Sequence, residues 1–355
     1  MKNMLFGCAL LSLFFCAQAS VSPMRVLAIG NSYTRSLESE LQNVAKAAGV
    51  NLDLAIFAIG GRTLSNHWIN CEAALKDPSV KQYWVRNRGM ANLPEMLADG
   101  TWDVIALQEQ SEGGMYPDRF DPWADRLVAL IRERQPKAKL YFQLTWADPA
   151  FSPRITNGRG GLGLLKMTQD EMASALEKNY TAQAKRLGLR LIPVGPALQL
   201  YRKRLPVTVG AFEPEYIAGL KDGEVPDIKG ELSGWFEWSK GEKWHKDYGV
   251  HKLRKDHHHL NREGKYLQAC VWVSSLTGKD LTNLSYVPDF GVDFQRRASL
   301  IRRCAVDAAA SFACTRTIKM LPDEKWWGLC NDFGRGHRLI RNGSSDRRRS
   351  MRCAP

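Results

Sequence analysis

The sequence predicts an α/β fold with a mainly parallel sheet, and three observations lead to this prediction. Short apolar runs rich in Val, Ile, Leu, Phe and Ala alternate with helical patterns along the chain. Gly49 and Gly188 stand between a helical pattern and the next apolar run, where left-handed helix caps are common. Hydrophobic residues make up 44% of the 355 residues and charged residues 25%, which are ordinary values for a globular protein with a buried core.

The expected strands are the apolar runs at residues 24–30, 51–57, 103–107, 139–144 and 189–194. The expected helices lie between them, at residues 35–49, 86–98, 121–135 and 168–187. A further helix is expected after Asn261, which can cap a segment whose apolar positions suggest one packed face. Strands that alternate with helices in this way form βαβ units, in which the strands are parallel.

Two regions interrupt this alternation. Residues 148–167 are rich in Pro and Gly and follow the fourth expected strand, which indicates a loop over the strand ends. Residues 206–250 are interpreted as a second insertion, in which Trp235, Trp238 and Trp244 lie among charged residues. Such tryptophans either stack on sugar rings or pack a small subdomain, and the sequence allows both.

The first nineteen residues have the order of a cleavable export signal. A lysine near the start is followed by an apolar run and then by Ala-Gln-Ala. We therefore expect residues 1–19 to be removed, the mature chain to begin at Ser20, and the protein to be secreted or periplasmic; an uncleaved anchor is the alternative. No later segment has the ~18 continuous apolar residues of a membrane-spanning helix, so no stable membrane insertion is expected after cleavage.

Six of the eight cysteines would remain in the mature chain, at positions 71, 270, 304, 314, 330 and 353. An exported protein can form disulfides, but the spacing alone assigns no full set of partners. Cys304 and Cys314 are the expected neighbours. No Cys-x-x-Cys pair occurs, which argues against a structural zinc site.

The formal charge of +13 is concentrated near the C-terminus. Residues 316–355 contain ten Lys and Arg against four Asp and Glu, so this segment contributes +6. We interpret residues 280–355 as a basic C-terminal extension that is partly disordered, and residues 20–279 as the folded domain. An exported protein seldom meets nucleic acid, so no nucleic-acid partner is expected; an acidic polysaccharide or an anionic membrane surface suits the charge better.

Ser32 stands directly after the first expected strand, and open parallel sheets bind ligands where their strands end. A serine there can also simply cap the following helix. A distant segment favours a catalytic role, because Asp256 and His259 lie three residues apart just before the helix that follows Asn261. An imidazole can take the proton of a serine hydroxyl, and a carboxylate can orient the imidazole and stabilise its charge.

The chain resembles the SGNH (GDSL-like) hydrolase superfamily over residues 24–278. "GNSY" stands where that family has its Gly-Asp-Ser block, and "DHHHL" stands where it has Asp-x-x-His-Leu. "IGGRT" is similar to its glycine block, and "DVIALQEQS" lies on the strand where the family ends with Gly-x-Asn-Asp. The resemblance implies a three-layer α/β/α sandwich with a flavodoxin-like parallel sheet, and a hydrolase that needs no cofactor.

The resemblance also implies a role for each matching residue. Ser32 would be the nucleophile and His259 the base that takes its proton, while Asp256 would orient the imidazole. The backbone amides of Ser32 and Gly61 and the side-chain amide of Gln110 would form the oxyanion hole.

Two positions depart from the family pattern. Asn31 replaces an aspartate that mainly supports the nucleophile loop. Gln110 takes the place of the asparagine that donates to the oxyanion, and it offers the same amide on a longer arm. A poorly characterised secreted branch of the superfamily has "GNS" and "LQ-x-Q-S" in the same places, and this chain is most similar to that branch.

Glu109 is expected to point away from Gln110, because neighbouring residues of a strand alternate in direction, and is not expected to be a catalytic acid.

We therefore expect a secreted serine esterase, a carboxylic ester hydrolase that removes an acyl group such as acetyl from a small or polymeric carbohydrate. His67, Trp235 and Trp238 are the candidate substrate-binding residues, although His67 also suits a hydrogen-bonded structural role. The alternative is a non-catalytic carbohydrate-binding protein on the same fold, which the two altered blocks favour.

His257 and His258 raise the question of a metal ion, together with His259 and His251. Adjacent histidines on an extended loop point in different directions, so at most two are expected to converge. Acidic co-ligands are not evident in the sequence. We therefore predict no metal site.

Overall fold

The computed structural model describes residues 22–152, 166–205, 219–221, 224–226, 228, 230–238 and 253–314. The predicted export signal lies outside these residues, as do Trp244 and most of the two predicted insertions. A compact unit of the chain ends at Ala313.

The central sheet contains five strands, in the order β2 (Leu52–Ala58), β1 (Met24–Gly30), β5 (Val104–Leu107), β6 (Lys139–Leu144) and β7 (Arg190–Pro193). All neighbouring strands in it are parallel. Its first strand in the chain lies between the second and the third, which is the strand order of flavodoxin-like folds. The predicted fold class is confirmed, and each predicted strand agrees with an observed one to within one residue at either end.

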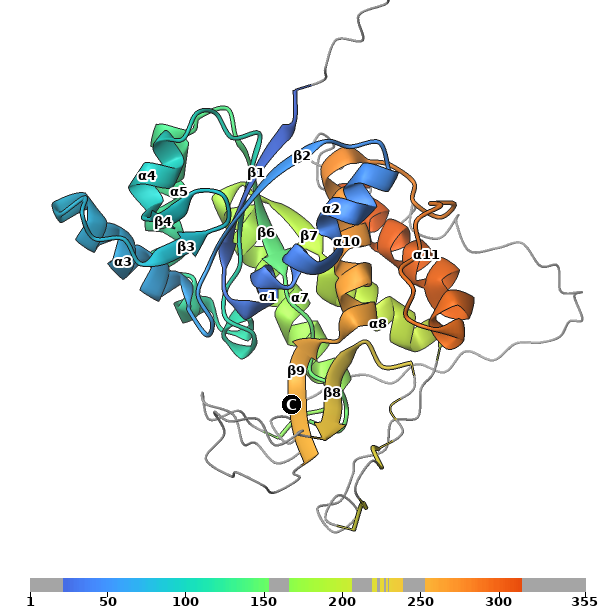
Figure 1. The fold of residues 1–355 in the computed structure, drawn as a ribbon. Coiled ribbons are helices and arrows are strands. Elements are labelled where there is room, and N and C mark those ends of the chain that lie inside the picture. Colours follow the sequence, from blue (N-terminus) through green and yellow to red (C-terminus); the bar gives the residue numbers. More distant parts are fainter. Residues whose placement is uncertain are drawn as a thin grey trace, which may run out of the picture. The chain divides into compact units, whose positions relative to one another are not determined.

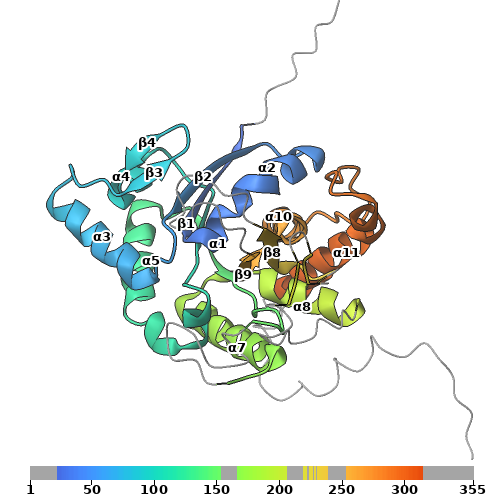
Figure 2. The same cartoon turned by 60° about the horizontal axis from the view of Figure 1, so that its bottom comes forward.

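The two faces of the sheet are covered by different helices. Val26 and Ala28 of β1 belong to one buried cluster, and Leu27 and Ile29 belong to the other, because successive strand residues point to opposite faces. The first face is covered by α2 (Leu37–Ala47), α8 (Val194–Arg204), α10 (Arg262–Thr277) and α11 (Val292–Cys314). The second is covered by α3 (Leu64–Lys76), α4 (Leu93–Ala98), α5 (Trp123–Arg134) and α7 (Gln169–Leu187). Figures 1 and 2 show this three-layer arrangement.

Most of the predicted helices are present, and their ends follow ordinary capping rules. The patterns at 35–49, 121–135 and 168–187 correspond to α2, α5 and α7. The helix expected after Asn261 is α10, and the Asn261 side chain accepts hydrogen bonds from two amides of its first turn. Helices α3 and α8 were not predicted, although Thr63 and Asn66 form a capping box that marks the start of α3.

The helix predicted at 86–98 is wrong over its first half. Strands β3 (Tyr83–Val85) and β4 (Gly89–Ala91) form a hairpin there, and only α4 is helical. The turn between the strands contains Asn87 with φ 62° and Gly89 with φ 79°, both in the left-handed region that ends a helical run.

The C-terminal boundary predicted at residue 279 does not coincide with the end of the compact unit. Helix α11 packs into the core through apolar residues that recur every three or four positions: Phe294, Ala298, Ile301, Ala305 and Ala308. This helix was not predicted, because its apolar residues are interspersed with polar ones and it lies in a basic segment. Residues 315–355 of the predicted extension lie outside the described residues.

The predicted pairing of Cys304 with Cys314 is also wrong, because Cys304 is a free, buried thiol. Both residues belong to α11 and are ten positions apart, which is about 15 Å along a helix axis, whereas a disulfide needs Cα atoms within about 7 Å. Cys71 and Cys270 are free and buried as well.

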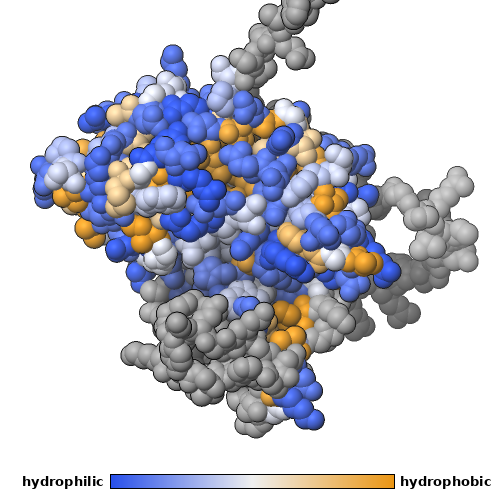
Figure 3. Space-filling view, in the orientation of Figure 1, coloured by the Kyte–Doolittle hydropathy of each residue, from blue (hydrophilic) through white to orange (hydrophobic). Residues whose placement is uncertain are grey.

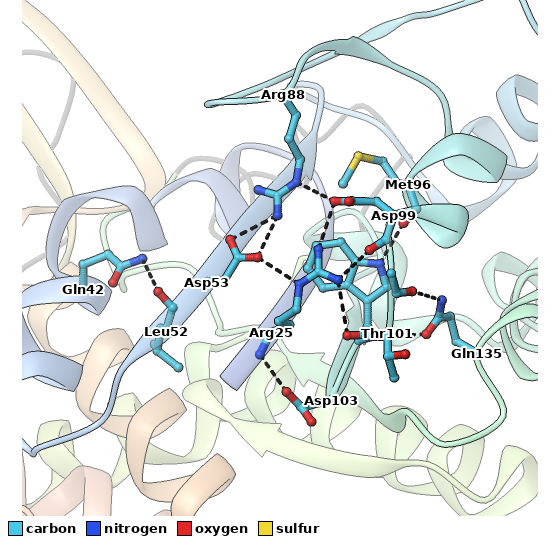
Figure 4. Close-up of polar contacts among 12 residues, drawn as sticks. Arg25, Gln42, Leu52, Asp53, Arg88, Met96, Asp99, Thr101, Asp103 and Gln135 are labelled. Carbon is cyan, nitrogen blue, oxygen red and sulfur yellow. Dashed lines mark hydrogen bonds and ion pairs between the residues drawn. The ribbon is translucent and has the colours of Figure 1, made fainter. Parts of the chain in front are cut away.

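Figure 4 shows an ion-pair network at the amino ends of β1 and β2. Asp53 accepts from Arg25 Nε at 3.0 Å and from Arg88 at 2.8 Å, and Asp99 Oδ2 accepts from the same two guanidinium groups. Both guanidinium groups lie over the Trp102 ring, at 4.3 and 5.4 Å from its centre. The network fastens the β3–β4 turn to the sheet, at the edge opposite to the carboxyl ends of the strands.

We expect Asp53→Asn to lower the free energy of unfolding by about 1–2 kcal/mol at pH 7, because the charge-assisted bonds to both arginines are weakened. Burial alone would raise the pKa of Asp53, but the bonds from Arg25 and Arg88 lower it below its ordinary value. The stabilisation is thus present above the unfolded-state pKa and is lost as the pH falls through the folded-state pKa. Urea unfolding at pH 7 and at pH 3 tests this, with exposed Asp118→Asn as the control; equal stability of wild type and Asp53→Asn at pH 7 would contradict it.

The side of the molecule drawn in Figure 3 is mainly hydrophilic, with apolar side chains in small separate patches. The large exposed apolar residues include Ile69 and Leu75 of α3 and Trp84 and Met90 of the β3–β4 hairpin. None of the helices in the described part of the chain is long and apolar enough to cross a membrane.

Candidate active site

Ser32 is the first residue of the short helix α1 (Ser32–Arg35), directly after β1. The residue before it caps this helix: Asn31 Oδ1 accepts a hydrogen bond from the Tyr33 amide at 3.0 Å. Asn31 Nδ2 donates to the carbonyl of Arg62 at 3.0 Å and so ties the serine loop to the glycine block. Capping is therefore the role of Asn31, and the Ser32 hydroxyl has a different partner.

That partner is His259. The Ser32 Oγ and the His259 Nε2 are 2.8 Å apart, and His259 Nδ1 is 2.7 Å from Asp256 Oδ2. Asp256 Oδ1 accepts from the amides of His258 and His259, at 2.9 and 2.7 Å. The three side chains predicted to act together are thus joined in a single chain of hydrogen bonds.

The electrostatics of Asp256 suit this arrangement. Burial alone would raise the pKa of its carboxyl, but the bonds from the His259 ring and from the amides of His258 and His259 hold the pKa well below its usual range. Asp256 therefore stays ionised at neutral pH. A carboxylate 2.7 Å from Nδ1 favours the tautomer that carries its proton there, which leaves Nε2 with a lone pair facing Ser32.

Two aromatic residues that were not predicted support the segment that carries Asp256 and His259. Tyr33 and Trp146 stack face to face, with ring centres 4.0 Å apart, and the Trp146 Nε1 donates to the His258 carbonyl at 2.8 Å. Tyr33 also meets the His259 ring edge-on at 5.5 Å. Trp146 lies two residues after the end of β6, and this position just beyond a strand end was the available signal.

A buried ion pair also helps to hold the segment that carries Asp256 and His259. Strand β9 (Leu253–Leu260) carries Asp256 and His259 and pairs with β8 (Ser233–Trp238) in an antiparallel sheet. At the start of β8, Arg202 of α8 pairs with Glu231 at 2.8 Å, and the side chains are only 9% and 4% exposed. Arg202 also donates to Ser233 Oγ at 2.8 Å. The segment that carries Asp256 and His259 is therefore anchored both to the central sheet and to α8. The region predicted as an insertion at 206–250 supplies β8.

The loop after β5 contains two glutamines, Gln108 and Gln110, of which Gln110 is the predicted oxyanion donor. Gln110 is partly buried, and its Nε2 lies 3.4 Å from Ser111 Oγ. Gln108, which was not predicted, touches the serine loop directly: its Oε1 accepts from the Asn31 amide at 3.2 Å and from the Thr34 hydroxyl at 2.9 Å.

The close packing under the serine loop requires a glycine at position 30. A Cβ there would lie 2.2 Å from Thr34 Oγ1 and 2.6 Å from Gln108 Oε1, closer than any side chain tolerates. Gly61, the other predicted backbone donor, has φ 69° in an exposed turn after β2. A residue with a side chain would be strained in that conformation.

Glu109 is fully buried and binds two segments together. Its Oε2 accepts from the Leu64 amide at the start of α3, and its Oε1 accepts from the Gln110 amide, both at 2.8 Å. Burial raises the pKa of Glu109 to about 7, although both amide bonds oppose the shift. The residue thus connects the glycine block to the Gln110 loop from beneath, and it has no exposed surface from which to act on a substrate.

His67, a candidate substrate-binding residue, is instead buried where a substrate cannot reach it. His67 is 1% exposed, and its Nδ1 forms a hydrogen bond with the Tyr83 hydroxyl at 2.8 Å. Burial lowers its pKa to about 4, against a smaller opposing effect of the Gly30 backbone. Of the two roles considered for His67, the structure therefore supports the hydrogen-bonded structural one, within the helix layer that contains α3. Trp235 lies on β8 opposite Asp256 and is partly exposed, and Trp238 is the last residue of β8.

The arrangement also brings together three groups that can bind a metal ion. One ligand atom each of Asp256, His258 and His259 lie within 4.8 Å of one another. Two histidines converge, as expected, but the expectation that no acidic co-ligand is present is wrong, because Asp256 lies on the same short segment.

No protein-family model and no curated protein matches this chain. Among solved structures, it is similar to a DUF4886 family protein from Bacteroides uniformis, with 22% identity over 81% of this chain and 95% of that one and a TM-score of 0.59. A candidate SGNH hydrolase from Slackia heliotrinireducens gives 19% identity over 72% of this chain and all of that one, with a TM-score of 0.41. A G-D-S-L family lipolytic protein from Veillonella parvula gives 12% identity over 72% of this chain and 97% of that one, with a TM-score of 0.35. The first of these similarities establishes a shared fold.

Proposed function

We propose that this protein is a serine esterase of the SGNH (GDSL-like) superfamily, from the branch with "GNS" and "LQ-x-Q-S". The observation that carries the proposal is the continuous hydrogen-bond chain from Ser32 through His259 to Asp256, with separations of 2.8 and 2.7 Å. This is the geometry that activates a serine hydroxyl. The residues come from the first strand–helix corner and from β9, at opposite ends of the domain sequence.

In the proposed reaction, Ser32 Oγ attacks the acyl carbon of the ester while His259 Nε2 takes the hydroxyl proton. The imidazolium that forms is stabilised by the Asp256 carboxylate. The proton then passes from Nε2 to the leaving alcohol oxygen, which leaves an acyl group on Ser32. A water molecule then attacks this acyl-enzyme, with His259 Nε2 taking its proton. As the bond between the acyl carbon and Ser32 Oγ breaks, Nε2 returns the proton to Oγ and the carboxylic acid departs.

The negative oxygen of the tetrahedral intermediate needs donors that are already in place. The Ser32 and Gly61 amides and the Gln110 side chain are the proposed donors, and one such donor contributes about 3 kcal/mol to the transition state. The Asn31 bond to Arg62 holds the Gly61 turn beside Ser32, and Glu109 joins that turn's helix to Gln110.

The direct test is hydrolysis of p-nitrophenyl acetate by the purified mature chain. We expect saturable release of p-nitrophenol that is abolished by prior treatment with an organophosphate. A rate no higher than that of buffer would contradict the proposal. If the protein then still bound carbohydrate, the non-catalytic alternative would replace it.

The substrate that we propose is an acetyl ester on a sugar. Trp235 supports this, because its place opposite Asp256 in the β8–β9 ladder puts an aromatic residue on the strand next to the histidine segment. Aromatic rings beside a site are suited to stacking on sugar rings. Acetate release from acetylated xylo-oligosaccharides, compared with hydrolysis of p-nitrophenyl octanoate, tests the preference; faster cleavage of the octanoate would contradict it.

Gln110→Ala is expected to reduce kcat by roughly 10²–10³ while changing KM little, because its amide would donate only to the charge that develops in the transition state. Gln110→Asn restores an amide at shorter reach and is the matched comparison. Steady-state kinetics on p-nitrophenyl acetate measure both. A Gln110→Ala enzyme with wild-type kcat would mean that the side chain is structural and that the two backbone amides suffice.

We also propose that the protein acts outside the cytoplasm after export. The basis is the lysine, apolar run and Ala-Gln-Ala of its first nineteen residues. N-terminal sequencing of the secreted or periplasmic material should begin at Ser20. Recovery of the intact Met1 terminus in a membrane fraction would instead support an uncleaved anchor.

A further inference from the structure

The catalytic histidine has a second histidine beside it, and the two rings face the same space. The ring centres of His258 and His259 are 4.1 Å apart, with an angle of 41° between the planes. His257, by contrast, packs toward Phe151 and Phe236, with ring centres 6.0 and 6.3 Å away. Two of the three consecutive histidines thus share one side of the segment.

Asp256 completes a ligand set on that side. Its carboxylate is 2.7 Å from His259 Nδ1 and 3.8 Å from His258 Nδ1. Ligand atoms around a tetrahedral zinc ion are about 3.3 Å apart, since each lies about 2.0–2.1 Å from the metal. One ligand atom from each of the three residues lies within 4.8 Å of the other two, so changes of up to about 1.5 Å in their separations would bring them to the distances that the ion needs.

The two histidines are partly open to solvent, and the ligand set is chemically selective. The His258 and His259 side chains are 31% and 33% exposed, so an ion can reach them. Two imidazoles with one carboxylate suit Zn²⁺ and similar transition metals, whereas Mg²⁺ and Ca²⁺ prefer oxygen ligands. Water would supply the fourth ligand.

We propose that Asp256, His258 and His259 form a reversible inhibitory site for Zn²⁺. The proposal rests on the esterase function proposed above. A neutral imidazole has one nitrogen with a lone pair and one that carries the proton. When Zn²⁺ takes the lone pair of His259 Nδ1, the proton moves to Nε2. Nε2 then donates to Ser32 Oγ and cannot accept its proton, so the nucleophile is not activated.

The ligand set is tested without any need for activity. Zn²⁺ is titrated into the chelator-treated mature chain carrying Ser32→Ala, and binding is measured by calorimetry. The same chain with His258→Ala added is expected to bind the ion at least about tenfold more weakly, a loss typical even of outer-shell partners of a metal. The same chain with His257→Ala added is the matched control and should bind like the parent. His258→Gln should repeat the His258→Ala result, and circular dichroism confirms folding.

The inhibition is tested on the active chain. Zn²⁺ should suppress p-nitrophenyl acetate hydrolysis with a midpoint that matches the calorimetric affinity. EDTA should restore the rate, and Mg²⁺ should leave it unchanged. With each variant compared to its own metal-free rate, His258→Ala should shift the Zn²⁺ midpoint upward at least about tenfold, and His257→Ala should not shift it.

Equal Zn²⁺ affinity of the parent, His257 and His258 chains would overturn the proposed site. Inhibition with an unchanged midpoint in His258→Ala would overturn the proposed mechanism. If the wild-type chain hydrolysed no ester, the esterase proposal would fail, and the calorimetry would still decide whether the three residues bind zinc.

Discussion

Ser32→Ala is expected to lower kcat on p-nitrophenyl acetate by roughly 10⁴–10⁶, because it removes the only atom that forms the acyl bond in the proposed reaction. KM should change little, since the hydroxyl contributes little to binding of the ground state. Any residual rate would come from the oxyanion donors acting on a water molecule. Steady-state kinetics with enzyme concentrations high enough to detect that residual rate measure the effect.

Ser39→Ala provides a control, because Ser39 is an exposed serine on the following helix. It should keep the wild-type kcat. Thermal unfolding should give nearly the same midpoint for all three proteins. Equal rates for wild type and Ser32→Ala would exclude Ser32 as the nucleophile.

His259→Ala is expected to have the next largest effect, with kcat reduced at least about 10³-fold. Without the imidazole, the Ser32 hydroxyl keeps its proton and is a weak nucleophile. Asp256 would then also lose the ring that it orients at 2.7 Å. The kinetics should show the loss in kcat rather than in KM.

The neighbouring histidines make this prediction specific. His257→Ala should retain most of the activity, because its ring packs toward Phe151 and Phe236. His258→Ala should lose far less than His259→Ala, since the imidazole nitrogen 2.8 Å from Ser32 Oγ belongs to His259. If the ranking were reversed, the base would be another histidine and the hydrogen-bond chain would have a different meaning.

The parts of the fold that local sequence determines were predictable. Each strand of the central sheet is an apolar run, because both of its faces are buried under helices. The grouping of Ser32, Asp256 and His259 was also predictable, since one residue follows the first strand and the other two lie three apart on one segment. No pattern in the sequence fixes their distances, which depend on how β9 packs against α1.

The errors have local and tertiary causes. The β3–β4 hairpin depends on a turn at Asn87 and Gly89 that a helical apolar pattern concealed. The burial of His67 depends on Tyr83, a residue of that same unpredicted hairpin. Gln108 and Glu109 differ in partners because the loop after β5 is shaped by contacts with the Asn31 loop and with α3. Such contacts join segments that are distant in sequence and leave no periodic signal.

The central claim is that Ser32 is a nucleophile activated by His259, and covalent labelling tests it most directly. The purified protein is treated with a fluorophosphonate, digested, and mapped by mass spectrometry. We expect one phosphonate adduct per chain on the peptide that contains Ser32, no adduct in Ser32→Ala, and much slower labelling in His259→Ala. An unlabelled wild-type chain, or an adduct that persists in Ser32→Ala, would contradict the claim.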